Sequence, residues 1–439
     1  MNYLQLILFV ACGIINISER CDSQRTDPSY LPIRSDVEFT VQAEIPNWIV
    51  INWRNFWRPA TYIVLAQDFP INSFVKTESW IFGTRWLYDT NNGRQKQASF
   101  VFQPKADSGQ QRTVHYDSKS MNGVGVSTKC FGYYAYFVDG NGKVLSSYCM
   151  KLYPTWMNDL KVHLGRFRIR ELFIPGTHDS TSYNTGLINP ISLIHKYGIT
   201  QYDNIRQQLL RGVRYIDLRV GYTPLIRPFF WSAHGALNWR QLTVDLDQIR
   251  QFALETKEII IVDMHNIENG ANFAEVNDKL VQLLNNSLGD VMASPRIGWN
   301  GKLQDIWNSG RTVLVSYNNG DVVQKYPNLV WPEIQQKWPN VQNIENLYSY
   351  LTSFRNQQAS PNSVQPFADM AEFTPTVLGV VTGKDPGLRA SADLVNPHVN
   401  QWYFNDFGPT ANIVAVDFLR GTSIVDAAIY WNLQRVPRS

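Results

Sequence analysis

The chain has little net charge, few cysteines and no long apolar run beyond its first residues. Its 439 residues carry a formal net charge of only +3, so a broad basic surface is absent and nucleic acid is not an expected partner. Beyond the N-terminus no segment approaches the roughly 20 apolar residues that a membrane-spanning helix needs. With 44% hydrophobic and 18% charged residues, the composition fits one large or two medium globular domains.

A short apolar run covers residues 4–17, and polar residues follow from Ser18 onward. The run has the length of the hydrophobic region of a signal peptide and is too short to span a bilayer. We therefore predict a signal peptide over residues 1–22 and secretion of the protein to the extracellular space. An uncleaved membrane anchor is the alternative interpretation.

Four cysteines are present, and Cys12 and Cys21 lie in or next to the apolar run. The other two, Cys130 and Cys149, flank two strand-like segments separated by Asp139-Gly140, a dipeptide that favours a two-residue hairpin turn. Pairing about that turn brings Cys130 opposite Cys149, close enough for a disulfide between antiparallel strands. We predict this bond, and with it an oxidising compartment. Two reduced, buried cysteines are the alternative.

The segment after the predicted signal peptide has the rhythm of β-strands. Residues 37–45 alternate strictly between apolar and polar side chains, which is typical of a half-buried antiparallel strand. Further strand-like runs cover residues 48–53, 61–66, 79–87 and 98–102, with no convincing helix between them. The pattern predicts an all-β sandwich domain over residues 23–153.

After Tyr153-Pro154 short apolar runs alternate with helical stretches. The expected strands cover residues 172–174, 215–220, 229–232, 258–263, 312–317, 376–381 and 412–417, and the clearest helices cover residues 244–256, 273–284 and 423–433. This alternation predicts an α/β domain over residues 154–439, folded as a (β/α)8 TIM-type barrel. No strand can be assigned with the same clarity between residues 326 and 369.

Ionisable side chains stand at the ends of successive predicted strands. In chain order they are His178 and Asp179, Asp217 and Arg219, His234, Asp263 and His265, and Asp417. Such groups are costly to bury without a purpose, and the catalytic groups of a barrel lie at the carboxyl ends of its strands. Two imidazoles, an arginine and carboxylates are what in-line phosphodiester cleavage requires, namely a base, an acid and a fixed cation at the phosphate.

Three segments resemble the X domain of phosphatidylinositol-specific phospholipase C. They are Gly176-Thr177-His178-Asp179-Ser180, Arg214-Tyr215-Ile216-Asp217-Leu218-Arg219 and His234-Gly235. The resemblance covers about residues 155–439 and is to the bacterial enzymes and the animal X-domain-containing proteins, which lack the Y half of the large calcium-regulated enzymes. It implies an enzyme that cleaves phosphatidylinositol or a glycosyl-phosphatidylinositol lipid through an inositol 1,2-cyclic phosphate.

The resemblance also implies a role for each matched residue. His178 would be the general base that takes the proton of the inositol 2-hydroxyl, and His234 the general acid that protonates the diacylglycerol oxygen. Asp179 would hydrogen-bond His234, and Arg219 would clamp the phosphate. The aspartate that orients the base in this family is matched best by Asp417.

Asp406 is the second candidate for that orienting aspartate.

The expectation about metal use depends on Arg219, because the calcium-dependent members have a carboxylate at the matching position and an asparagine where this chain has Asp179. A guanidinium supplies fixed positive charge where the metal would otherwise lie. We therefore expect no metal and no cofactor.

Three further residues are weaker candidates for substrate binding. Asp217 and Asp263 could bind inositol hydroxyls and Tyr317 could stack on the ring, but each could equally be a structural residue of the barrel. The segment from Leu225 to Trp231 could form an apolar rim that touches lipid, or a buried strand. We expect a monomer that contacts a membrane surface transiently.

Two other functions remain open at this level. Sphingomyelinase D and glycerophosphodiesterase are also histidine-based barrels, but Asp217-Leu218-Arg219 lacks the second carboxylate of their Glu-x-Asp magnesium site. A non-catalytic lipid- or glycan-binding protein on the same fold is the other alternative, although every polar position of the motif set is intact.

Overall fold

The computed structural model describes residues 37–43, 48–54, 56, 60–66, 74–77, 85–88, 96–97, 100–112, 121, 123–183, 193–268, 273–358 and 365–437. The predicted signal peptide over residues 1–22 lies outside these ranges and stays a prediction. Within them, no helix has the length and apolar character that crossing a membrane requires.

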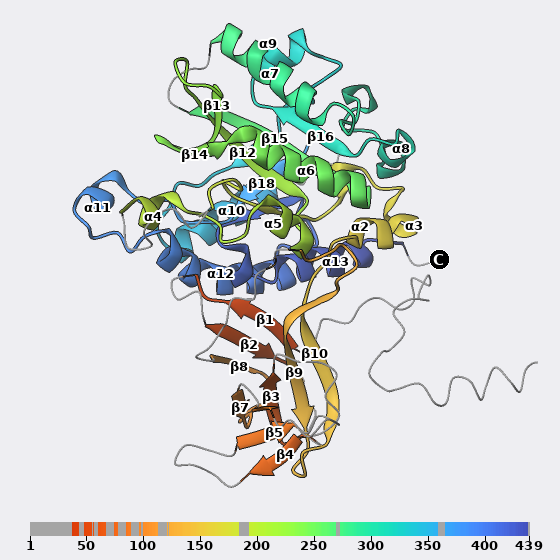
Figure 1. Cartoon of the computed structure of the whole chain (residues 1–439), viewed down its shortest axis with the longest axis vertical. Helices are drawn as coiled ribbons and strands as arrows, with labels where there is room; N and C mark the ends of the chain where they lie inside the picture. The colour runs from red at the N-terminus through yellow and green to blue at the C-terminus, as the bar shows by residue number, and fades with distance from the viewer. Residues whose placement is uncertain are drawn as a thin grey trace, which may run out of the picture.

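The second part of the chain forms a curled, mostly parallel sheet, seen in the upper half of Figure 1. In spatial order its parallel strands are β16 (Val313–Tyr317), β15 (Ile260–Glu268), β12 (Tyr215–Tyr222), β11 (Ile174–Thr177), β19 (Ile413–Val416), β18 (Phe367–Met370) and β17 (Gln335–Lys337). An antiparallel hairpin of β13 (Phe230–His234) and β14 (Leu237–Gln241) extends from the end of β12. The fold of this part is therefore mixed α/β.

The expected eight-stranded closed barrel is present only in part. Seven parallel strands lie within the described residues, and β16 meets the segment leading to β17 through an isolated bridge between Ser316 and Trp331 rather than through a ladder. Of the predicted barrel strand at residues 229–232, residues 230–232 belong to the antiparallel β13. The sheet is thus a curled half-barrel. Within the described residues, the bridge between Ser316 and Trp331 is the contact between β16 and the segment before β17.

The predicted strand at residues 376–381 is wrong. It is the helix α11 (Val377–Val381), which begins where the side chain of Thr376 accepts a hydrogen bond from the backbone N–H of Gly379. Three of its apolar side chains, those of Val377, Leu378 and Val381, are exposed rather than buried in a sheet. A run of β-branched residues indicated a strand, but the Thr376 N-cap favours the helix, and no strand among the described residues pairs with this segment.

Helices cover the outer face of the curled sheet. The longer ones are α5 (Ile205–Arg211), α6 (Leu242–Thr256), α7 (Ala274–Leu288), α10 (Ile344–Gln358), α12 (Leu388–Asn405) and α13 (Ile424–Gln434). The short ones are α2 (Trp156–Asp159), α3 (Lys161–Leu164), α4 (Leu193–Gly198), α8 (Leu303–Asn308) and α9 (Gly320–Lys325), with 3-10 turns η2 (Ile169–Glu171), η3 (Pro295–Ile297) and η4 (Leu419–Gly421). Their apolar faces and the outward residues of the strands form the largest core of the molecule.

The described residues of the first part of the chain, up to residue 153, form strands and connections without a helix, in keeping with the predicted all-β character. Its sheets have the orders β1-β2-β8, β10-β9-β3-β7 and β4-β5-β6. The strands are β1 (Val37–Val41), β2 (Ile49–Trp53), β3 (Tyr62–Ala66), β4 (Phe74–Thr77), β5 (Arg85–Tyr88), β6 (Lys96–Gln97), β7 (Phe100–Phe102), β8 (Gly109–Arg112), β9 (Cys130–Val138) and β10 (Val144–Lys151). Residues of the first two sheets share one hydrophobic core. The sandwich arrangement and the domain boundary at residue 153 stay predictions.

The disulfide between Cys130 and Cys149 is present, but the predicted hairpin register is wrong. The connection between β9 and β10 is longer than two residues, because the Asp139 carboxylate accepts backbone hydrogen bonds from Asn141 at 2.8 Å and Lys143 at 3.0 Å. Cys130 lies opposite Lys151 across an irregularity in the ladder. The two cysteine Cα atoms are nevertheless 5.6 Å apart, within the range that a disulfide bridges.

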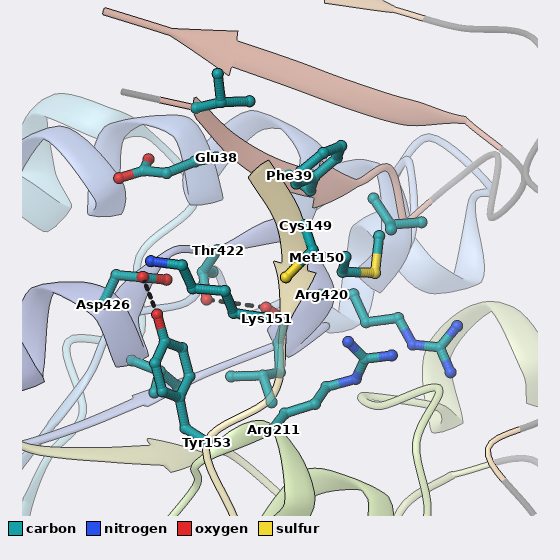
Figure 2. A pocket seen from close by; sticks show the side chains of 14 residues that line it. Glu38, Phe39, Cys149, Met150, Lys151, Tyr153, Arg211, Arg420, Thr422 and Asp426 are labelled. Atoms are coloured by element: carbon teal, nitrogen blue, oxygen red, sulfur yellow. Dashed lines mark hydrogen bonds between the residues drawn. The ribbon is translucent and has the colours of Figure 1, made fainter. Parts of the chain in front are cut away.

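The two parts of the chain meet at β1, α12 and η4, in the middle of Figure 1. The backbone N–H of Ala43 donates to Asp393 of α12 at 2.6 Å, and the Tyr202 hydroxyl donates to the Ala43 carbonyl. Figure 2 shows a pocket at this junction, where the Tyr153 hydroxyl donates to Asp426. No histidine lines this pocket, so it lies apart from the predicted chemistry.

Candidate functional site

Alternation along the strands decides which side chains enter the candidate site. On β12 the outward residues Ile216, Leu218 and Val220 pack in the core under the helices, so Tyr215, Asp217 and Arg219 face the concave side. Tyr215 packs into a second core at the amino end of the strands, whereas Asp217 and Arg219 follow at the carboxyl end. The concave face is therefore apolar at one end and charged at the other.

The turn after β11 places His178 and Asp179 at that charged end. A Cβ atom on Gly176 would lie 2.7 Å from the ring of Tyr215, so glycine is what lets β11 approach β12 so closely. Asp179 has a φ of 41°, a left-handed conformation that few residues other than glycine adopt. Its backbone N–H donates to Asp217 at 2.9 Å, which holds the turn in place.

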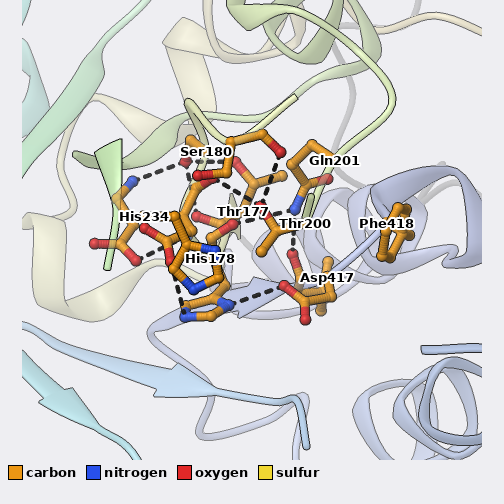
Figure 3. Close-up of polar contacts among 12 residues, drawn as sticks. Thr177, His178, Ser180, Thr200, Gln201, His234, Asp417 and Phe418 are labelled. Atoms are coloured by element: carbon orange, nitrogen blue, oxygen red, sulfur yellow. Dashed lines mark hydrogen bonds and ion pairs between the residues drawn. The ribbon is translucent and has the colours of Figure 1, made fainter. Parts of the chain in front are cut away.

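His178 is almost completely buried, and Figure 3 shows its contact with Asp417. Its Nδ1 lies 2.9 Å from Oδ1 of Asp417, and its Nε2 lies 3.1 Å from Nη2 of Arg219. A carboxylate only accepts and a guanidinium only donates, so the pair of contacts is satisfied by a ring with a proton on Nδ1 and a lone pair on Nε2. That form of the ring is able to accept a proton.

His234 ends β13 and has the opposite pattern of partners. Its Nδ1 lies 3.0 Å from the carbonyl oxygen of Gly198, and its Nε2 lies 3.2 Å from Oδ2 of Asp179. The carbonyl oxygen only accepts, so Nδ1 of His234 carries a proton. Nε2 faces the Asp179 carboxylate at ion-pair distance without hydrogen-bond geometry, since neither oxygen of Asp179 has a hydrogen-bond partner within the described residues.

The two imidazoles converge on one point of the site. Oδ2 of Asp179 lies 3.2 Å from Nε2 of His234 and 3.8 Å from Nε2 of His178. The other oxygen of Asp179 lies 3.0 Å from Nε of Arg219. The sequence predicted that these residues share a site but not their geometry, and here they lie within reach of one small group.

Neighbouring charges shift the protonation of these groups. Burial opposes the charge on His178, but the carboxylates of Asp417 and Glu372 outweigh it and raise its pKa to about 10. Burial likewise disfavours the charged form of Asp217, but Arg219 and His178 hold the pKa of that carboxyl at about 2. The pKa of Arg219 is raised by Asp179 and Asp217 despite its burial, so it remains a fixed cation.

Asp263 lies beneath the site, where protein groups occupy both of its oxygens. The Tyr215 hydroxyl donates to Oδ2 at 2.6 Å, and the Ser316 hydroxyl donates to Oδ1 at 2.7 Å. Gln336 of β17 donates to Asp217 at 3.0 Å and so connects the two carboxylates. Asp217 and Asp263 are thus the supporting layer of the site, and their predicted contact with a substrate stays a prediction.

The predicted stacking of Tyr317 on a substrate ring is wrong. Tyr317 is 2% exposed, belongs to the core beneath the helices and donates from its hydroxyl to Asn277 of α7 at 2.6 Å. Ser316, the preceding residue, is the one that faces the concave side. The alternation along β16 therefore turns Tyr317 away from the site.

The structure separates the two candidates for the orienting aspartate. Asp417 follows β19 and contacts His178, whereas Asp406 is exposed at the end of α12. His265 lies partly buried at the end of β15, where Asn318 is its neighbour. Neither Asp406 nor His265 has a contact with the two imidazoles among the described residues.

Glu372 is a site residue that sequence reasoning missed. It follows β18, is 3% exposed, and offers a carboxylate oxygen that lies with donor atoms of His178 and Asp417 within 4.8 Å of one another. This trio has the donor types of a metal site, but the Arg219 guanidinium beside His178 opposes a further cation there. The segment before Glu372 had no clear strand pattern, so nothing marked it as a strand end.

The chain was compared with known proteins, and no family model matches it. Among curated proteins, PI-PLC X domain-containing protein 3 of Danio rerio is 26% identical over 307 residues, which are 64% of this chain and 93% of the relative. PI-PLC X domain-containing protein 2 of Homo sapiens is 28% identical over 280 residues, 58% of this chain and 87% of that protein.

The comparison with solved structures found proteins with a similar fold. The phosphatidylinositol-specific phospholipase C of Staphylococcus aureus with an incorporated pentafluoro-Phe has a TM-score of 0.50 and 15% sequence identity, covering 64% of this chain and 97% of that one. A second structure of this enzyme, concerned with its membrane binding, has the same score and identity and covers the same shares. The predicted resemblance to the X-domain family is confirmed in sequence, and the shared fold supports it.

Proposed function

We propose that this protein is a phosphatidylinositol phospholipase C-like phosphodiesterase that acts on phosphatidylinositol or a glycosyl-phosphatidylinositol lipid. The observation that carries the proposal is the convergence of two imidazoles with different partners, those of His178 and His234, beside the guanidinium of Arg219. A phosphodiester needs a base, an acid and a fixed cation at these relative positions. The resemblance to the X-domain proteins supplies the substrate class.

His178 acts as the general base. Asp417 holds the proton on Nδ1, which leaves Nε2 to take the proton of the inositol 2-hydroxyl. The freed oxygen attacks phosphorus, and a five-membered cyclic phosphate forms as the bond to the diacylglycerol oxygen breaks. The carboxylate behind the ring stabilises the imidazolium that results.

His234 acts as the general acid in the same step. Its Nε2 gives a proton to the departing diacylglycerol oxygen, and Asp179 and the Gly198 carbonyl hold the ring in place. One proton is taken by His178 and one is given by His234, so the products are diacylglycerol and inositol 1,2-cyclic phosphate. The ring is partly exposed, which suits a group that must meet a leaving group at the mouth of the site.

Arg219 binds the phosphate and makes a metal unnecessary. Its guanidinium lies between His178 and Asp179 and carries charge at any pH at which the protein is folded. We expect a chelator such as EDTA to leave the rate of cleavage unchanged. A large loss of activity that calcium restores would contradict metal independence.

The experiment that tests the proposal is product analysis on phosphatidylinositol micelles. The unmodified protein should release inositol 1,2-cyclic phosphate, and His178→Ala and His234→Ala should not. His163→Ala, a histidine of α3 outside the site, is the matched control and should behave as the unmodified protein. Choline or a cyclic ceramide phosphate from sphingomyelin would contradict the proposal in favour of the other enzyme class, and lipid binding without turnover would favour a binding protein.

The cellular setting belongs to the same proposal. The Cys130–Cys149 disulfide supports secretion, because such bonds persist in oxidising compartments. The membrane binding named for the Staphylococcus aureus enzyme supports transient contact with a lipid surface here as well. We further propose that the curled sheet is a TIM-type barrel of this family and that the protein acts as a monomer.

A further inference from the structure

Glu372 has a contact pattern that the catalytic scheme above does not use. Ala368 and Met370 of β18 lie in the core on the concave side of the sheet, and Glu372 continues that alternation toward the site. Its Oε1 atom is buried and has no hydrogen-bond partner within the part of the chain that the structure describes. A buried carboxylate oxygen without a hydrogen-bond partner lowers the stability of the folded protein, so a functional reason for its position is expected.

Two opposing influences meet at His178, and Glu372 is part of one of them. Arg219 lies at Nε2 and can only donate, which favours the neutral ring. The carboxylates of Asp417 and Glu372 favour the imidazolium. Only the neutral ring can act as a base. The balance between these influences therefore decides the pH above which His178 is neutral.

We propose that Glu372 is a positioning residue that sets the charge state of His178, and thereby the pH range in which His178 accepts the proton of the substrate. The catalytic half of this statement rests on the proposed function. Asp417 alone is sufficient to hold Nδ1, so the second carboxylate is not needed for orientation. Its effect is on the charge of the ring, because its carboxylate oxygen lies within 4.8 Å of a ring nitrogen in a buried site.

The groups that face Glu372 support this role. They are His178 of the β11 turn, Asp417 after β19, Arg219 of β12 and the indole of Trp338 after β17. Burial and the nearby Asp417 raise the pKa of Glu372 to about 7, although His178 and Arg219 act in the other direction. The carboxyl therefore changes charge in the range where such an enzyme would work, and each change is felt by His178.

The sign of the effect follows from the charges. When Glu372 is ionised it stabilises the proton on His178, so the neutral base appears only at higher pH. Replacing Glu372 with glutamine removes that charge and keeps the shape of the side chain. The neutral base then appears at lower pH, so Glu372→Gln is expected to be faster than the unmodified protein on the acidic side of its pH profile.

The test is the pH profile of kcat/KM on phosphatidylinositol, with EDTA present throughout. In Glu372→Gln the acidic limb should move to lower pH by about one unit or more, the order expected for one charge at this separation in a partly screened site. Glu372→Asp keeps the charge and should keep the limb near its original pH. Glu333→Gln, the same change at an exposed glutamate, is the matched control and should not move the limb.

Two results would overturn the inference. One is a limb that stays in place or moves to higher pH in Glu372→Gln. The other is a uniform loss of activity with the limb unmoved, because that pattern is what a merely structural role would give.

A second measurement separates this inference from the proposed function. The ring of His178 is titrated by ¹⁵N NMR in the full chain without substrate, with His178→Ala to assign its signal. Glu372→Gln should lower the titration midpoint, and an unchanged midpoint overturns the inference whatever the protein cleaves. If the unmodified protein releases no cyclic phosphate, the proposed function fails while the NMR comparison still decides the role of Glu372.

Discussion

Two arginines lie among carboxylates along β12, Arg214 directly before the strand and Arg219 within it, and their contacts differ. Arg214, before the strand, is 1% exposed at its side chain and donates to Glu258 and to four backbone carbonyl oxygens. Arg219, at the carboxyl end, is 19% exposed, and its ion pair with Asp179 at 3.0 Å lacks hydrogen-bond geometry. The first guanidinium is saturated by the protein, whereas the second keeps capacity for a ligand.

The carboxylates repeat the contrast. Glu258 accepts from the backbone N–H groups of Met157 at 3.0 Å and Asn158 at 2.6 Å in addition to Arg214. Glu372 is equally buried but has an oxygen without a partner in the described part of the chain. Burial by itself therefore does not mark a functional charge in this protein. The two carboxylates differ instead in how completely the protein satisfies their oxygens.

The largest expected effect comes from removing either imidazole of the carboxyl end. His178→Ala and His234→Ala should each lower kcat/KM on phosphatidylinositol by about 10²–10⁴-fold, the usual contribution of a general acid or base. The two variants should differ on an inositol phosphodiester with a nitrophenol leaving group, which departs without protonation. Activity should return in His234→Ala alone, measured by release of nitrophenolate, and recovery in His178→Ala would reverse the assignment of base and acid.

The next effect separates the two arginines directly. Arg219→Lys should lower kcat/KM by about 10²–10³-fold, because an ammonium cannot reproduce the fork of donors that holds a phosphate. Its urea unfolding curve should stay close to that of the unmodified protein. A large loss of stability with little loss of activity would place Arg219 in the same structural class as Arg214.

The amino end should show the reverse pattern. Glu258→Gln breaks a buried, fully bonded pair and should lower the free energy of unfolding by about 3 kcal/mol, as measured by urea denaturation. The folded fraction should keep its kcat/KM and its pH profile. Glu275→Gln, which breaks the exposed pair with Lys279, should leave the urea unfolding curve close to that of the unmodified protein and serves as the control.

The smallest effect is a pH dependence of stability from the carboxyl end. Because the folded pKa of Asp217 is about 2, below the value of 3.8 for a free aspartate, its contribution is complete above pH 4 and is lost as the pH falls toward 2. The shift corresponds to about 2 kcal/mol. Asp217→Asn should therefore flatten this part of the unfolding free energy against pH, and an unchanged slope would show that Asp217 is not the group responsible.

Much of the site could be predicted from the sequence because its signals are local. The strand, turn and residue types of Gly176–Ser180 and of Arg214–Arg219 lie within a few residues of one another, and an alternating or apolar run reveals each strand. The all-β character of the first part and the disulfide followed in the same way. The hairpin register could not be predicted in this way, because the Asp139 side chain stabilises a longer loop than the dipeptide Asp139-Gly140 alone indicates.

Other features depended on packing that a single segment does not reveal. Residues 376–381 have a strand composition, yet residues 377–381 form α11 at the surface, and no strand in the described part of the chain pairs with them. Tyr317 was placed one position out of phase with the concave face. Glu372 and Gln336 follow or lie in strands too short to show a period, so their arrival at the site was not predictable from the pattern.

The sequence by itself determined which residues are candidates for the proposed chemistry, because histidines, an arginine and carboxylates stand at the ends of its predicted strands. It also determined the α/β and all-β character of the two parts through hydrophobic periodicity. Only the tertiary structure decided which groups contact each imidazole, because Asp417, Arg219 and Gly198 come from distant parts of the chain. It also decided that the Glu372 side chain lies in the site and that the Tyr317 side chain lies in the core beneath the helices. The strands packed against a residue determine which side of the sheet its side chain faces.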